Sequence, residues 1–199
     1  MKVKIKKEGK VKEFKLISSW EEVTLEKWLQ LIDFETGTKT EEATETIAAL
    51  SDIPKQLVKE LALSDVAVIM SKVGELQSKQ DTKLKRIIEI NDIEYGFHPD
   101  LDSISLGEYA DIEQFIKNGI ESNLPSLMAV LYRPIKEKKN DIYIIDAYDG
   151  DIRMRTEEMK QMSAEQVQSA LVFFYIFVKA LCEILQSFSI QVQKETKTQ

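Results

Sequence analysis

The feature that most constrains the fold is an apolar stretch at residues 163–188 (SAEQVQSALVFFYIFVKALCEILQSF). Ser163 and Gln166 have the spacing of a capping box, in which two side chains satisfy backbone N–H groups at the start of a helix. Residues 170–178 are all apolar, so little of the helix surface is polar. A surface helix needs an apolar face only about 100° wide. We therefore expect a long, buried C-terminal core helix that other elements enclose.

The same stretch does not suit a membrane span, because Lys179 and Glu183 interrupt it before the ~20 apolar residues that a span requires. The chain has 199 residues, of which 43% are hydrophobic and 31% charged, as in an ordinary globular protein. Its net charge of −7 argues against nucleic acid as a partner. Cys182 is the only cysteine, and the first residues (MKVKIKKEGK) lack the apolar region of a signal peptide. We expect a cytoplasmic protein with no membrane partner.

The first half of the chain, residues 1–78, is predicted to form a β-hairpin followed by helices. The hairpin occupies residues 2–16, where Val3 and Ile5 alternate with lysines and Gly9 supplies the turn. The helices are expected at 24–34, at 40–50, from Pro54 onward, and from 64 to 76. Residues 77–84 have no apolar period and are expected to be a linker.

The second half, residues 84–190, is expected to repeat this order. A hairpin at 85–97 turns near Asn91 and Asp92, and a capped helix begins at Ser105. The remaining elements are an apolar helix stopped by Pro134, a charged loop at 136–141, a strand at 142–148 added to the second hairpin, a short helix at 154–161, the core helix, and a polar tail at 191–199. The whole chain is thus predicted to be an α+β protein, mostly helical, with small antiparallel hairpins packed against helices.

An internal repeat is one interpretation of this similarity. With an offset of 81 positions, Thr24 aligns with Ser105, Leu25 with Leu106, Trp28 with Tyr109, and Leu31 with Ile112. The alternative is coincidence, because capped amphipathic helices are common. The lysine-rich first hairpin also has two interpretations, a basic patch for nucleic acid or membrane, or charge that protects an exposed strand edge. We favour the second.

No combination of residues indicates catalysis, a cofactor or a metal. The acidic run at 146–151 does not fit a calcium loop, because a glycine at its sixth position would put Ile145 and Thr156 at ligand positions. His98 is the only histidine, which makes a zinc site improbable, and there is no Gly-x-Ser-x-Gly motif and no phosphate-binding glycine loop. We therefore predict a protein that is not an enzyme.

Several short segments resemble a known family. In order, they are residues 88–97, 101–109 (LDSISLGEY), 127–135 (LMAVLYRPI), 148–150 (YDG) and 170–175 (ALVFFY), with a looser likeness at 47–54 and 63–65. This pattern resembles the tail assembly chaperones of tailed bacteriophages. The resemblance implies a protein of the host cytoplasm that transiently binds the phage tape-measure protein or another tail protein. The alternative is a virion structural protein of the neck, tail or baseplate.

Four residues are candidates for partner binding: Trp20, Trp28, Tyr132 and Arg133. Trp28 shares a helix face with Leu25, which favours the core. Trp20 precedes the helix cap, where it either packs onto the helix or stays partly exposed, and the hypothesis is that it borders a client groove with the helices at 54–76. Arg133, at a helix end, is expected to pair with Asp146 or Asp149 and to have a structural role. Phe174, in the middle of the apolar run, is expected in the core. The oligomeric state is left open.

Overall fold

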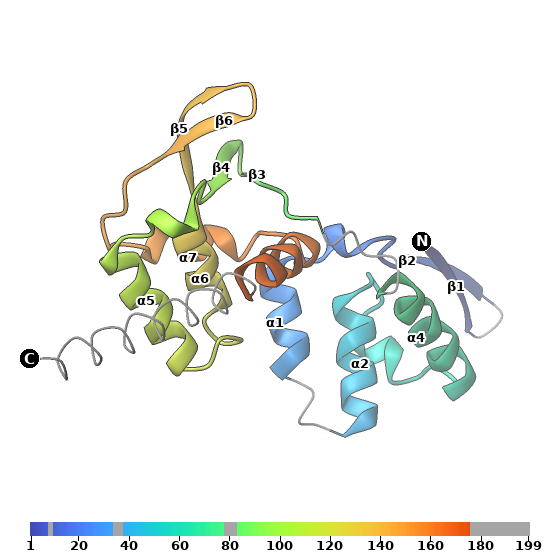
Figure 1. Cartoon of the computed structure of the whole chain (residues 1–199). Helices are drawn as coiled ribbons and strands as arrows, with labels where there is room; N and C mark the ends of the chain where they lie inside the picture. Colours follow the sequence, from blue (N-terminus) through green and yellow to red (C-terminus); the bar gives the residue numbers. More distant parts are fainter. Residues whose placement is uncertain (8–9, 34–37, 78–82, 176–199) are drawn as a thin grey trace, which may run out of the picture.

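The computed structural model describes residues 1–7, 10–33, 38–77 and 83–175, and it confirms the predicted α+β class (Figure 1). In the first half, strands β1 (Lys2–Lys7) and β2 (Lys10–Lys15) form an antiparallel hairpin. A 3-10 turn η1 (Trp20–Glu22) and four helices follow it: α1 (Leu25–Asp33), α2 (Lys39–Ala49), α3 (Lys55–Val58) and α4 (Leu63–Gln77). These elements lie where the sequence pattern predicts them. Most of the expected linker, residues 78–82, lies outside the described residues.

The second half contains an antiparallel sheet of four strands in the order β3-β4-β5-β6. Strands β3 (Ile87–Ile90) and β4 (Ile93–Phe97) form the predicted hairpin. Asn91 and Asp92 both have positive φ, as the tight two-residue turn of such a hairpin requires. Ile88, Ile90, Tyr95 and Phe97 point from this sheet into the core.

The predicted charged loop at 136–141 is wrong. Residues 136–139 continue strand β5 (Tyr132–Lys139), which turns at Asn140 (φ 56°) and pairs with β6 (Ile142–Ile145). The sequence shows no apolar alternation here because neither face of this projecting hairpin is buried against the helices (Figure 1). Pairing with β6 holds the charged segment extended. The strand expected at 142–148 is therefore shorter, and it joins the β3–β4 hairpin only through β5.

The helices of the second half are α5 (Leu106–Lys117), α6 (Leu124–Leu131) and α7 (Arg153–Met159), with a 3-10 turn η3 (Leu101–Ser103) before α5. Another helix occupies residues 164–175 of the described chain. Helix α6 is buried along its whole length and ends at Leu131, where the chain passes directly into β5. It is thus the central helix of this half.

The two halves have separate apolar clusters, which meet along the start of α1. The backbone N–H of Leu25 donates to Met162 over 2.7 Å, and the N–H of Ala164 donates to Val23 over 2.7 Å. These bonds join the start of α1 to the start of helix 164–175. As a result Leu25 belongs to the second-half cluster and Ala164 to the first-half cluster. The boundary between units at residues 78–84 stays a prediction.

The order of elements recurs as the repeat interpretation expects, since each half has a hairpin, a 3-10 turn and a capped helix. The aligned leucines nevertheless have opposite environments. Leu25 is fully buried, whereas Leu106 is 84% exposed. Helices α1 and α5 therefore dock through different faces, and the residue-by-residue alignment does not describe their packing.

Helix 164–175 has the predicted capping box: the N–H of Ser163 donates to Gln166, and the N–H of Gln166 donates to the Ser163 hydroxyl. Val167, Ala170 and Phe174 are buried, as expected. Val172, Phe173 and Tyr175 are exposed, so the prediction of a helix enclosed on all sides is wrong for its described part. Residues 176–188 of the predicted helix and the tail lie outside the described residues. Across the described ranges, no helix combines the length and the apolarity that a membrane crossing needs.

Candidate functional site

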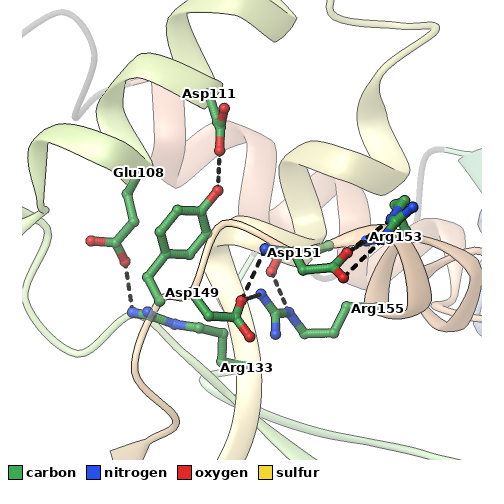
Figure 2. Close-up of polar contacts among 9 residues, drawn as sticks. Glu108, Asp111, Arg133, Asp149, Asp151, Arg153 and Arg155 are labelled. Carbon is green, nitrogen blue, oxygen red and sulfur yellow. Dashed lines mark hydrogen bonds and ion pairs between the residues drawn. The ribbon is translucent and has the colours of Figure 1, made fainter.

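Charged and aromatic side chains meet where α5, β5, the segment 146–152 and α7 converge (Figure 2). At its centre is an ion pair between Glu108 of α5 and Arg133 of β5, with 2.8 Å between Oε1 and Nη2. Both side chains are buried. Because an ion in a protein interior loses its hydration, each of these charges depends on the other.

The capping box of α5 fixes Glu108. Its Oε2 accepts a hydrogen bond of 2.7 Å from the backbone N–H of Ser105, and its own N–H donates to the Ser105 hydroxyl. His98 lies on the other side, with Nε2 3.5 Å from Oε1 of Glu108. The chain holds His98 at this point because its N–H donates to Leu131 at the end of α6.

This environment favours ionised Glu108 and neutral His98. Burial alone would raise the pKa of Glu108, but the hydrogen bonds from Ser105 and the charge of Arg133 outweigh it and hold the pKa below its usual value. Burial lowers the pKa of His98, although Glu108 partly opposes this shift. The cluster at neutral pH is thus one carboxylate, one guanidinium and an uncharged imidazole.

Tyr148 and Arg155 close the outer side of the cluster. The ring of Tyr148 lies 5.8 Å from the guanidinium carbon of Arg133, within the range of a cation–π contact, and its hydroxyl donates to Asp111. Arg155 donates from Nε to the carbonyl of Ala129 over 3.2 Å and lies 3.7 Å from Asp149. These contacts tie the segment after β6 to helices α5 and α6.

A surface pocket of about 360 Å³ lies beside this cluster. Its lining is Asp111, Phe115, Ser126, Gly150, Ile152, Arg153, Thr156 and Glu157. Asp111 is already bonded to Tyr148, and Thr156 donates to Ser126. Among the described residues, no group of three or more His, Cys, Asp or Glu side chains is placed to hold a metal ion. The contacts of the cluster join α5, α6, β5 and the segment after β6, so the arrangement is suited to fixing the fold.

Arg133 is buried, but its predicted partners are wrong. It pairs with Glu108 instead of Asp146 or Asp149, because β5 carries it under α5. The sequence does indicate a fixed position for Glu108, since Ser105 and Glu108 have capping-box spacing. It does not indicate that Glu108 lies beside Arg133. The role of His98 in this cluster was also missed, for the same reason.

The other candidate binding residues are largely withdrawn from solvent. Tyr132 is fully buried, and its hydroxyl donates to the carbonyl of Lys85. Trp20 is only 8% exposed and belongs to the first-half core, so the prediction that it borders an open client groove is wrong. The turn η1 folds its ring inward. Trp28 is half-buried and packs against both apolar clusters.

A different surface is apolar and exposed. Val172, Phe173 and Tyr175 project from the end of the described helix 164–175. Phe173 also stacks edge-on against the buried ring of Phe97, with 5.6 Å between ring centroids. Phe174 points the other way, into the core. The three exposed side chains, called here the helix-end patch, therefore stand on a helix that the core holds firmly.

Comparisons with protein-family models, with curated proteins and with solved structures find no match. Three of the segments that carry the sequence resemblance do, however, meet in space. LGEY supplies Glu108, YRP supplies Arg133, and YDG supplies Tyr148, all to the same cluster. In FFY, Phe174 is in the core, and Phe173 and Tyr175 belong to the helix-end patch.

Proposed function

We propose that this protein is a tail assembly chaperone of a tailed bacteriophage, which transiently binds the tape-measure protein in the host cytoplasm. The resemblance of its short segments to that family motivates the proposal. The observation that carries it is the helix-end patch, because Val172, Phe173 and Tyr175 are apolar, exposed and held on a fixed helix.

The chemistry of the patch suits such a client. A tape-measure protein is a long, apolar-rich helical chain, and an amphipathic helix binds by placing its apolar face against apolar side chains of the receptor. Aromatic residues commonly dominate the binding energy of these contacts. Tyr175 is 75% exposed and offers both a ring and a hydroxyl to a partner. The net charge of −7 would keep the protein soluble and disfavour binding to the phage genome.

The polar cluster has a supporting role in this proposal. Glu108, Arg133 and Tyr148 join α5 to the sheet, and the same apolar core anchors Phe174 beneath the patch. The segments of the resemblance would then preserve the fold that presents the client surface. A bond-making or bond-breaking step has no place in this function.

The test is a co-expression pull-down of the tape-measure protein from the same genome. The variant V172S/Y175S changes two exposed side chains of the patch, and we expect it to capture at least about tenfold less client. The matched control is L106S, since Leu106 is also an exposed apolar side chain but lies on α5. Its capture should equal that of the parent.

Equal capture by V172S/Y175S and the parent would overturn the patch as the client site. Absence of capture by the parent itself would overturn the chaperone proposal. A stoichiometric amount of the protein in purified virions would instead assign it to the virion structure.

A further inference from the structure

We infer that strand β6 is a self-association edge, through which two copies of the chain pair their four-stranded sheets antiparallel into one sheet of eight strands. No described strand lies beyond β6, and the β5–β6 hairpin projects away from the helices (Figure 1). Most proteins protect such an edge with charged side chains, proline or a covering element. β6 is short and its pairing with β5 contains a bulge, but its sequence Ile-Tyr-Ile-Ile has no charged residue and no proline.

The backbone of β6 has groups available for pairing. In a hairpin with a two-residue turn, the residues that flank the turn exchange both hydrogen bonds, here Lys139 and Ile142. The direction of the backbone N–H and C=O groups alternates along β6, so those of Ile144 also point toward β5. The N–H and C=O groups of Tyr143 and Ile145 consequently point away from β5, toward the open edge.

The side chains of β6 are packed on one face of the sheet and exposed on the other. Tyr143 is held on one face of the sheet, over Gly96, where its hydroxyl donates to the carbonyl of Phe97 over 2.7 Å. Ile142 and Ile144 lie on the opposite face and are 78% and 57% exposed. That face covers the core near β3 and β4, but it extends past the helices at this end. Two isoleucines on adjacent positions of one face are what a neighbouring strand would bury.

A second copy offers β6 an edge with the same free backbone groups, and the charges of β5 favour one register, mainly at low salt because they lie three strand spacings, about 14 Å, apart. Lys139 is the cross-strand partner of Ile142, and Glu137 is the partner of Ile144. If Tyr143 lies opposite Tyr143 of a second copy, Ile142 lies opposite Ile144 of that copy. Each row of side chains across the joint then has four members: Lys139 and Ile142 of one copy, followed by Ile144 and Glu137 of the second copy. The two ends of the row therefore carry opposite charges. A register centred on Ile144 would instead place two glutamates at the ends of the central row.

The experiment is sedimentation equilibrium of the full chain at concentrations up to about 1 mM, because a joint of one short strand binds weakly. We expect the parent to shift from monomer to dimer with concentration. The variant I142K/I144K should raise the dissociation constant at least about tenfold, since it places lysines against each other across the joint. M154K, at another exposed apolar side chain on α7, is the matched control and should dimerise like the parent.

The register has its own test. At about 0.01 M salt, where charges this far apart still interact, E137K and K139E each create rows with like charges at both ends and should weaken dimerisation, whereas E137K/K139E restores opposite charges and should recover it. A parent that stays monomeric throughout, a dimer unaffected by I142K/I144K, or no recovery in the double charge reversal would each overturn the inference. Circular dichroism on every variant checks that the fold is retained. Client capture does not enter any of these measurements, so the inference stands or falls apart from the chaperone proposal.

Discussion

Nη2 of Arg133 lies 2.8 Å from Oε1 of Glu108, and both side chains are buried between α5 and β5. Arg133→Met should retain most of the apolar stem while leaving the Glu108 carboxylate buried without its cation. Breaking one side of a buried pair typically costs about 3–5 kcal/mol. We expect a loss of that size in the free energy of unfolding, measured by urea denaturation at pH 7.

The double variant E108L/R133M serves as the control for this prediction. It removes both charges together, so it should be more stable than R133M alone. Arg153→Ala breaks a fully exposed pair with Asp151 and should leave the denaturation midpoint unchanged. If R133M unfolds at the same urea concentration as the parent, the pair does not contribute to stability.

Phe174 and Tyr175 are neighbours in sequence that face the core and solvent, respectively. Phe174→Ala should lower the free energy of unfolding by about 3–5 kcal/mol, because it leaves a cavity in the second-half core. Tyr175→Ala should change it by less than about 0.5 kcal/mol. Thermal denaturation of the two variants, made side by side, checks the contrast. Equal melting temperatures would show that the helix does not pack as described.

Stability should decrease as pH falls, first through His98. Burial lowers its pKa in the folded state below the ordinary value of 6.5, so the unfolded chain takes up the proton first. The contribution of neutral His98 is therefore complete above pH 6.5 and is lost progressively below it. Glu108, whose folded pKa lies below its ordinary 4.5, adds a second loss at lower pH.

His98→Gln separates these two contributions, since glutamine does not titrate. Urea denaturation at intervals from pH 8 to pH 4 should show a smaller loss between about pH 6.5 and 5 for H98Q than for the parent. Identical curves for the two proteins would mean that the folded state does not perturb His98.

Gly96 on β4 has no room for a side chain. A Cβ there would clash with the ring of Tyr143 and lie 2.8 Å from a methyl group of Ile145. Gly96→Ala should therefore destabilise the protein by about 1–3 kcal/mol, as overpacking usually does. Gly107→Ala is the control, because its nearest atoms are 3.8 Å away and alanine favours a helix. Chemical denaturation in which G96A matches or exceeds G107A would contradict the close approach of β4 and Tyr143.

The sequence by itself determined the local elements. Capping boxes at Ser105 and Ser163, the turn at Asn91 and Asp92, and alternation in the first hairpin each act over a few residues, so their signals are readable without the fold. The apolar run predicted burial of Phe174, but it predicted the same for Val172, Phe173 and Tyr175, which are exposed. The charged strand at 136–139 was not readable, because its extended form depends on pairing with β6.

Only the tertiary structure decided which residues meet. Glu108 and Arg133 come from elements 25 positions apart, and packing of α5 against the sheet gives each its partner. The same docking exposes Leu106 while α1 buries the aligned Leu25. Trp20 is buried because η1 turns its ring into the first-half core. A capping motif states where a helix begins, but which face of that helix is covered depends on the surface it docks against, and that surface is assembled from distant parts of the chain.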